Sequence, residues 1–146
     1  MKRTPTVAAI HDLSGFGRCS LTIVMPVLSA MGLQCCPLPT AYLSTHTGGF
    51  TGNTFVDLTD AMAGAMDHWR ALGLRFSSIY TGFMGSARQM ALAADFIRDV
   101  RTPATLVVVD PVMGDHGKLY RTYTAEMCRA MALLADAADV IVPNYT

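Results

Sequence analysis

The stretch TLVVVDPVMGD, residues 105–115, decides the fold. Four apolar residues, 106–109, run without a polar break, and Asp110 and Pro111 follow. Such a run is typical of a strand buried on both faces in the middle of a parallel sheet. Proline cannot donate to a strand ladder, so the strand must stop there. Asp110 is therefore predicted at the carboxyl end of a central strand, the edge at which open α/β sheets bind ligands.

Strand and helix patterns alternate on both sides of this stretch. Further strands are expected at residues 6–10, 34–39 with 41–43 as a candidate continuation, 76–80 and 139–142. Helices are expected at residues 19–31 and 58–72, between Ser86 and Pro103, and from about Thr124 onward. Ser86 with Gln89 fits a capping box. Strands that alternate with helices require a parallel sheet with right-handed crossovers, so the fold class is α/β.

Composition narrows the class of protein. The chain has 146 residues, a formal net charge of zero and no run of Lys or Arg, which makes nucleic acid and anionic membranes poor partners. No window approaches the roughly 20 apolar residues of a membrane span. His11 and Asp12 interrupt the first apolar run, so it does not read as a signal peptide, and we expect a cytoplasmic protein. The four cysteines form no C-x-x-C pair and are expected to be buried free thiols.

Polar residues follow the apolar strands again and again. They are His11 and Asp12, the loop of residues 44–54, residues 81–83, Asp110 and Asn144. Because the carboxyl ends of parallel strands share one edge, this pattern predicts a ligand crevice.

Each of these residues also has an ordinary structural interpretation. Asp12 could cap the following helix, and His11 or His46 could be a solvated histidine. Asp110 could cap a turn, but a second acid at Asp115 favours magnesium and phosphate, since Mg²⁺ takes one or two carboxylates. The residues thus indicate a nucleotide or phosphate enzyme. The chain has no P-loop, no G-x-G-x-x-G after the first strand and no G-x-S-x-G elbow.

Five segments together resemble a known family. In order they are HDLSGFGRCSL (11–21), STHTGGF (44–50), YTGFMGS (80–86), VVVDPVMGD (107–115) and VPN (142–144). They resemble the pyridoxal/pyridoxamine kinases of the ribokinase-like superfamily. The resemblance implies a three-layer α/β/α fold with a mostly parallel central sheet, truncated at the C-terminal side. It also implies vitamin B6 salvage: ATP and Mg²⁺ serve to phosphorylate the 5′-hydroxyl of pyridoxal, pyridoxamine or pyridoxine, commonly in a homodimer.

The resemblance also assigns roles to single residues. On the vitamer side it implies Asp12, Tyr42, Leu43, His46, Thr47, Gly82 and Phe83. On the ATP and phosphate side it implies Asp110, also as the metal ligand, Asp115 and Asn144. Two positions depart from the pattern, because many family members have Ser at the position of Asp12 and Tyr at that of Phe83. The hydroxymethylpyrimidine kinases of the same superfamily share an N-terminal Asp and a DPVM segment, and are the nearest alternative.

Residues 1–146 are interpreted as the N-terminal portion of a single kinase domain. The family's G-x-G-D segment, which carries the catalytic base and an anion hole, does not occur in the sequence. We therefore expect no catalytic base here and little or no kinase activity of the chain alone. A non-catalytic vitamer-binding or dimerisation fragment is the alternative from another class. The last strand, 140–142, is expected to form an exposed apolar edge, which predicts self-association.

Overall fold

A computed structural model describes residues 4–115, 117–120 and 123–144, with only the backbone described at Asp115. Its main sheet has six strands in the order β3-β2-β1-β4-β5-β8, and every neighbouring pair is parallel except β2 with β3. The strands are β1 (Thr6–Phe16), β2 (Gln34–Thr45), β3 (Phe55–Asp57), β4 (Ser78–Thr81), β5 (Leu106–Val109) and β8 (Val140–Ile141). A separate two-stranded hairpin pairs β6 (Gly114–Asp115) with β7 (Lys118–Leu119).

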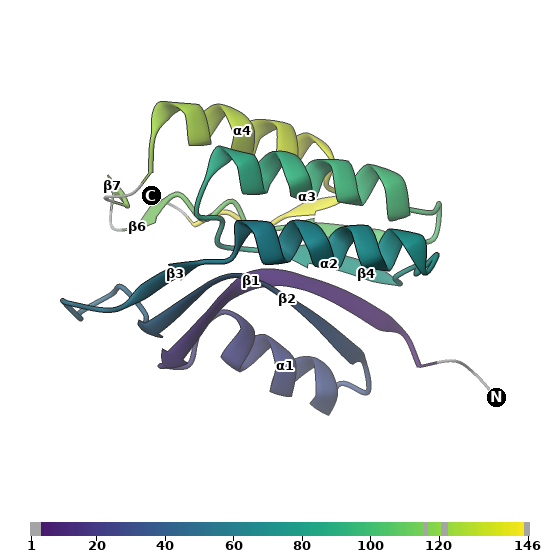
Figure 1. Ribbon diagram of the computed structural model, residues 1–146, viewed down its shortest axis with the longest axis horizontal. Helices are drawn as coiled ribbons and strands as arrows, with labels where there is room; N and C mark the ends of the chain where they lie inside the picture. Colours follow the sequence, from purple (N-terminus) through teal and green to yellow (C-terminus); the bar gives the residue numbers. More distant parts are fainter. Residues whose placement is uncertain (1–3, 116, 121–122, 145–146) are drawn as a thin grey trace.

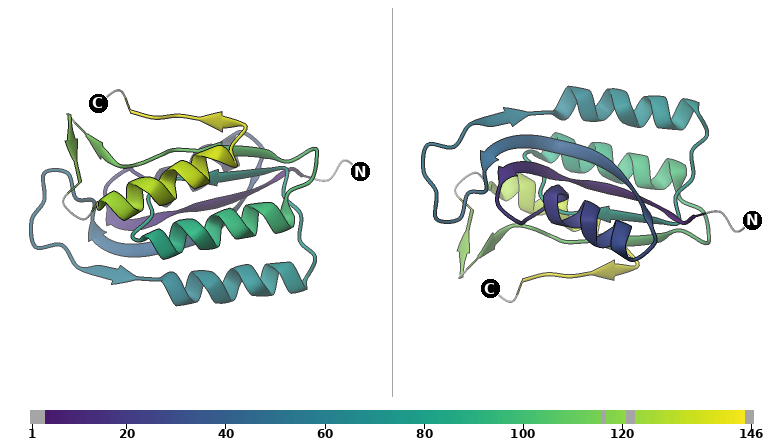
Figure 2. Two further views of the ribbon diagram at one scale, coloured as in Figure 1. Left: turned by 90° about the horizontal axis from the view of Figure 1, so that it is seen from above. Right: turned by 90° about the horizontal axis from the view of Figure 1, so that it is seen from below.

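Helices lie on both sides of this sheet (Figures 1 and 2). They are α1 (Leu21–Ala30), α2 (Thr59–Ala71), α3 (Ala87–Val100) and α4 (Ala125–Asp136). Helix α1 packs against β1 and β2 on one face, whereas α2, α3 and α4 lie side by side over the other face. The expected α/β fold with layers of helix, mostly parallel sheet and helix is confirmed.

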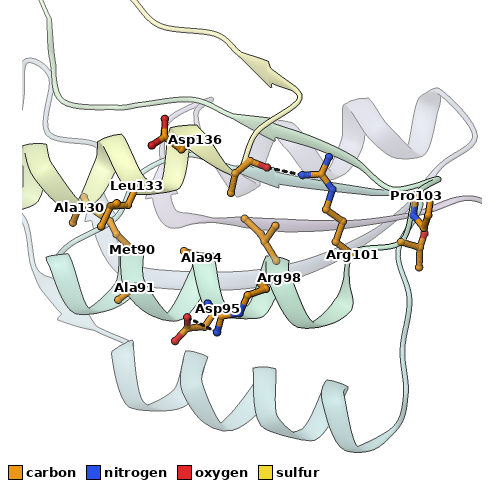
Figure 3. A pocket seen from close by; sticks show the side chains of 13 residues that line it. Met90, Ala91, Ala94, Asp95, Arg98, Arg101, Pro103, Ala130, Leu133 and Asp136 are labelled. Atoms are coloured by element: carbon orange, nitrogen blue, oxygen red, sulfur yellow. Dashed lines mark hydrogen bonds and ion pairs between the residues drawn. The ribbon is translucent and has the colours of Figure 1, made fainter.

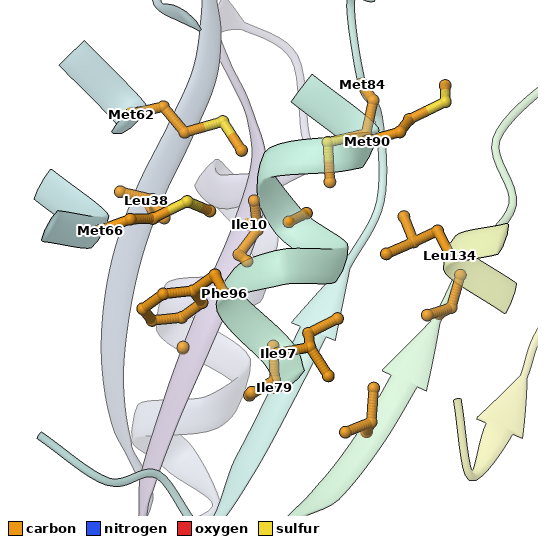
Figure 4. Close-up of a cluster of buried hydrophobic side chains, with 14 of the residues drawn as sticks. Ile10, Leu38, Met62, Met66, Ile79, Met84, Met90, Phe96, Ile97 and Leu134 are labelled. Atoms are coloured by element: carbon orange, nitrogen blue, oxygen red, sulfur yellow. The ribbon is translucent and has the colours of Figure 1, made fainter. Parts of the chain in front are cut away.

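The hydrophobic core lies between the sheet and helices α2, α3 and α4 (Figure 4). Met62 and Met66 reach into it from α2, Phe96 from α3 and Leu134 from α4, and each is at most 1% exposed. These side chains meet Ile79 on β4, which is fully buried. The methionines and aromatic residues on the apolar faces of these helices therefore belong to the hydrophobic core.

Strand β5 is buried on one face only, which corrects the expectation drawn from its sequence. Val107 and Val109 face α3 and α4 and are fully buried, whereas Leu106 is 47% exposed and Val108 is partly exposed. The reason is the position of α1, which packs on β1 and β2 and leaves the same face of β5 uncovered by any helix described. An unbroken apolar run could not show this difference.

The edge strand β8 carries the exposed apolar surface that was expected. Val140, Ile141 and Val142 are 43%, 52% and 45% exposed. Asp139 attaches this edge: one carboxylate oxygen accepts from the Val107 N–H at 2.8 Å, and the other pairs with Arg101. Self-association through this edge stays a prediction.

Several boundaries differ from those expected. Strand β1 continues to Phe16 through an irregularity in register between His11 and Leu13, so His11 and Asp12 lie within it and not after its end. Strand β2 is continuous through residues 41–43, as the candidate continuation suggested. Strands β3, β6 and β7 were not predicted. All four cysteines are free, as expected, but partly exposed instead of buried. None of the described helices is long and apolar enough to cross a membrane.

Candidate substrate and phosphate site

Backbone hydrogen bonds beyond the regular ladders hold the ends of β4, β5 and β8 beside one another and beside Ile10, where the pairing of β1 with β4 ends. Gly82 N–H donates to the Ile10 carbonyl at 3.0 Å, Asp110 N–H to the Thr81 carbonyl at 2.9 Å, and Val142 N–H to the Val109 carbonyl at 3.0 Å. The polar residues that follow Ile10, Thr81 and Val109 are therefore brought to one edge of the sheet.

Asp12 is a buried carboxylate, 6% exposed, held by two hydroxyl groups. The Ser14 hydroxyl donates to one of its oxygens at 2.9 Å, and the Ser20 hydroxyl donates to the other. Ser20 itself is the N-cap residue of α1, and its side chain makes no capping hydrogen bond. Asp12 thus contacts the start of α1 through the Ser20 side chain, and the N-cap position itself belongs to Ser20.

His11 is also buried, at 4% exposure, and its ring meets the Tyr80 ring edge-on with centroids 4.3 Å apart. Burial lowers the pKa of His11 to about 4, against a smaller opposing effect of a hydrogen bond to the Tyr80 backbone. Its Nε2 atom has no hydrogen-bond partner among the described residues. The imidazole is thus neutral at physiological pH, and the solvated alternative is wrong for this histidine.

Gly82 makes room for this imidazole. A Cβ built on Gly82 would lie 2.5 Å from Cε1 of His11 and closer still to Nδ1, well inside ordinary contact. The resemblance gave Gly82 the role of allowing close approach to the substrate. In the structure, the space left by its missing side chain is taken by His11.

The turn before α1 and the loop after β2 pack on one another. Gly17 has a φ of 129°, and a Cβ there would lie 2.5 Å from Cδ2 of His46. The ring of His46 meets Phe50 edge-on, with centroids 5.0 Å apart. Nearby, Tyr42 is 40% exposed and Thr47 is exposed, whereas Leu43 is buried at 3% exposure. Of these three residues, Leu43 is therefore the packed one, and Tyr42 and Thr47 are exposed.

Phe83 is held through its backbone and through a hydrogen-bond network centred on Gln89, which was not predicted. The Thr40 hydroxyl donates to the Phe83 carbonyl at 2.9 Å. The fully buried Gln89 accepts from Gly85 N–H at 2.7 Å and donates to the Thr40 carbonyl at 2.8 Å and the Thr59 hydroxyl at 2.9 Å. Gln89 thus ties the segment of Phe83 to β2 and α2.

A signal for Gln89 was present in the sequence. Ser86 caps α3 as expected, since its hydroxyl accepts from Gln89 N–H at 3.2 Å. The Gln89 side chain does not complete the capping box, because its oxygen bonds Gly85 N–H. Gln89 lies on the stripe that includes Ala93, Phe96 and Ile97, and a polar residue on an apolar helix face needs buried partners.

Asp110 lies half-buried beyond β5, and burial raises the pKa of its carboxyl. Burial, and then the charge of Asp110, raise the pKa of the Tyr80 phenol, so the two groups are neighbours. Asn144 is exposed beyond β8 and donates to the Gly114 carbonyl at 3.4 Å, which brings it to the DPVMGD segment. The Asp115 side chain lies outside the described part of the structure.

The described residues contain no group of three or more His, Cys, Asp or Glu side chains that could hold a metal ion. Mg²⁺ does not need such a group, because it keeps several waters and binds through one or two carboxylates together with substrate phosphates. Asp110 takes part in none of the ion pairs found in the described part of the chain. The half-buried carboxylate of Asp110 is therefore of the ligand type that a Mg²⁺ ion would take.

A cavity of about 820 Å³ lies elsewhere, in a groove between α3 and α4 (Figure 3). Ala91, Ala94 and Ala130 form part of its lining, and the ion pair of Asp95 with Arg98, 2.8 Å between the charged atoms, stands at its rim. The candidate site at the carboxyl edge of the sheet and this groove are therefore separate features.

Comparison with known proteins agrees with the motif resemblance, although no protein-family model matches the chain. Pyridoxal kinase PdxY of Vibrio parahaemolyticus is 31% identical over 147 residues, which cover 94% of this chain and 50% of that protein. Pyridoxal kinase PdxY of Photobacterium profundum is 34% identical over 146 residues, covering 94% and 49%. The chain spans about half the length of the curated relatives it matches.

Solved structures share the fold. A "putative phosphomethylpyrimidine kinase" from Bacteroides thetaiotaomicron is 51% identical with a TM-score of 0.94, over 98% of this chain and 49% of that one. A second crystal form of that protein contains pyridoxal. Pyridoxal kinase from Lactobacillus plantarum is 36% identical with a TM-score of 0.90, over 96% of this chain and 50% of that one.

The architecture is thus the α/β fold of pyridoxal kinase structures, with its polar strand ends gathered at one edge. The resemblance to pyridoxal kinases, first drawn from five short segments, is confirmed along 94% of the chain.

Proposed function

We propose that this chain serves the ATP-dependent phosphorylation of the 5′-hydroxyl of a B6 vitamer: pyridoxal, pyridoxamine or pyridoxine. It would form the N-terminal portion of a single kinase domain and carry the vitamer pocket with part of the metal and phosphate site. One observation carries the proposal. Asp12, Phe83 and Asp110 gather at the carboxyl edge of a sheet whose fold matches pyridoxal kinase structures.

The vitamer side of the site would comprise seven residues. They are Asp12, Tyr42, Leu43, His46, Thr47, Gly82 and Phe83. In this proposal the buried Asp12 carboxylate faces the ring, and the loop that carries His46 and Thr47 closes over it. Leu43 and Gly82 support the pocket from behind, since Leu43 is buried and Gly82 accommodates His11.

The phosphate side would comprise Asp110, Asp115 and Asn144, with Asp110 as a ligand of Mg²⁺. Bound Mg²⁺ neutralises charge on the transferring phosphate. Burial disfavours the charged form of Asp110 in the free chain, and a divalent cation reverses that balance. Asn144 would act beside it, and its hydrogen bond to the Gly114 carbonyl of the same segment supports this role.

The base that takes the substrate proton has no counterpart in this proposal, so we assign no catalytic residue. The chain alone would bind a vitamer but transfer no phosphate. Purified chain incubated with pyridoxal, ATP and Mg²⁺ is expected to form no pyridoxal phosphate above a protein-free control. Titration with pyridoxal, followed by absorbance, is expected to show saturable binding. Absence of binding at millimolar pyridoxal would leave only a structural or dimerisation role.

A hydroxymethylpyrimidine kinase-like activity is the second candidate, favoured by the name of the Bacteroides thetaiotaomicron structure at 51% identity. Competition separates the two: with equal, saturating concentrations of pyridoxal and hydroxymethylpyrimidine, more than half of the bound pyridoxal would be displaced only if the pocket prefers the pyrimidine. A cytoplasmic location and a homodimer complete the proposal.

A further inference from the structure

The groove between α3 and α4 has apolar walls and lies open at the surface (Figure 3). Its cavity of about 820 Å³ is lined in part by Ala91 and Ala94 on α3 and by Ala130 and Leu133 on α4. Leu133 is 68% exposed, the largest value for any large hydrophobic side chain among the described residues. An apolar hollow beside so exposed a leucine indicates a surface that contacts another molecule.

Two charged residues flank Leu133 on α4. Arg129 lies four residues before it and Asp136 three residues after it, so the three share one stripe of the helix. Both charged side chains are exposed, and neither takes part in an ion pair found in the described part of the chain. On the other wall, Arg98 and Arg101 already pair with carboxylates of the same chain. Helix α4 thus presents an apolar side chain between a cation and an anion that are both free to pair.

This stripe is complementary to a second copy of itself. At a rise of 1.5 Å per residue, Arg129 lies about 6 Å before Leu133 along the helix and Asp136 about 4.5 Å after it. When two copies of α4 meet antiparallel across a two-fold axis at Leu133, Arg129 of each copy comes level with Asp136 of the other. Two ion pairs then form at once. Any other partner would have to supply the same order of charges.

The groove supplies the matching hollow. Packed helices place the ridge of one helix into the groove formed by others. The two-fold axis that pairs the charges also directs Leu133 of each copy toward the groove of the other copy, where Ala91, Ala94 and Ala130 leave room. The chain has a formal net charge of zero, so two copies do not repel one another at long range.

We propose that two copies of this chain associate through the groove between α3 and α4, with Arg129 of each copy paired to Asp136 of the other. The inference rests on the proposed function only in naming the surface of its homodimer, and it is independent of the vitamer. One helix seated in one groove is a small interface, of the size found in weak and transient complexes. We therefore expect a reversible dimer that forms as the protein concentration rises.

Charge reversal tests the arrangement. Sedimentation equilibrium of the wild-type chain, 15.7 kDa, is expected to show a mass that rises reversibly with concentration toward twice this value. Arg129→Asp and Asp136→Arg each set like charges against one another at both contacts, and each should weaken association about tenfold or more. In an equal mixture of the two variants, one copy carries two anions and the other two cations. Both ion pairs form again, so association should return to within about threefold of the wild type.

Matched controls separate this from attraction between net charges. Arg75→Asp reverses an exposed charge outside α3 and α4, and should associate like the wild type. Its mixture with Asp136→Arg has the same net charges as the first mixture and should not restore association. Leu133→Ala should weaken association with little effect on folding, because the side chain is exposed. Val142→Lys, at the β8 edge, should leave association unchanged.

The outcomes separate the surface from the homodimer itself. A dimer that persists in both charge variants, or that only Val142→Lys disrupts, overturns the groove as the interface and leaves the homodimer intact. A mixture of the two charge variants that associates no better than either alone overturns the two-fold arrangement. A wild-type chain that stays monomeric up to about 1 mM overturns the homodimer together with this inference. The vitamer function is decided separately, by the pyridoxal titration.

Discussion

An alanine at position 82 would place a methyl group where the imidazole of His11 now lies. The added Cβ would be 2.5 Å from Cε1 of His11 and closer still to Nδ1, whereas ordinary contact begins at 3.4 Å. The ring cannot easily move away, because it is 4% exposed and packs against Tyr80. The strand end cannot easily move either, since Gly82 N–H donates to the Ile10 carbonyl at 3.0 Å.

Overpacking of this kind lowers the free energy of unfolding by about 1–3 kcal/mol in a core. Because neither His11 nor the strand end can easily move, we expect Gly82→Ala to lower it by about 3 kcal/mol. Urea unfolding followed by Trp69 fluorescence measures this, since Trp69 packs on Phe76 and Phe96 in the core. The midpoint is expected to fall with an unchanged slope. Gly64→Ala is the control: it lies in α2 with nothing within 4 Å of the added Cβ, and should stabilise by about 1 kcal/mol.

A double-mutant cycle tests the cause. In the background of His11→Ala the space is open, so Gly82→Ala should then cost less than about 1 kcal/mol, and the difference is the coupling energy. The reasoning is refuted if Gly82→Ala changes the free energy of unfolding by less than about 0.5 kcal/mol. It is also refuted if the cost is the same in both backgrounds.

Three further outcomes follow from the same geometry. Burial lowers the pKa of His11 from 6.5 in the unfolded chain to about 4 in the folded chain. Between these values only the unfolded chain binds the proton, so about 3 kcal/mol of stability is lost as the pH falls from 6.5 to 4. Urea unfolding across this range should show the loss, and His11→Gln should make the free energy of unfolding less dependent on pH. Gln89→Leu should cost about 2–4 kcal/mol, because it leaves the Gly85 N–H without its partner and removes the buried hydrogen bonds to the Thr40 carbonyl and the Thr59 hydroxyl; a midpoint equal to that of the wild type would contradict this. Asp139→Asn should weaken the attachment of β8, so hydrogen exchange at Val142 N–H should rise more than at Gly82 N–H.

Sequence reasoning reached the order of helices and parallel strands because hydrophobic periodicity sets it directly. The run 106–109, the amphipathic stripes and the capping residues Ser86 and Thr124 each carried a local signal that the structure keeps. The short antiparallel strand β3 was missed, because Phe55–Asp57 has three exposed residues and no alternation. Exposure of one face of β5 was missed as well, since it depends on where α1 packs.

The candidate site divides in the same way. The order of strands along the chain predicted that the site lies at the carboxyl edge of the sheet. Asp12 and Asp110 could be named as candidates because each follows an apolar run in the sequence. What the sequence could not give was the partner of each group. Ser20 reaches Asp12 only through a positive φ, and His11 fits only because Gly82 leaves space across two strands that are distant in sequence.

The location of the bound vitamer is the most direct test of the central claim. Backbone amide shifts of the chain, recorded by NMR during titration with pyridoxal, report which residues the ligand approaches. The proposal predicts saturable changes at Asp12, Phe83 and Asp110 along the carboxyl edge, and none at Ala94 or Leu133 in the groove between α3 and α4. Changes confined to that groove, or no changes at millimolar pyridoxal, would contradict it.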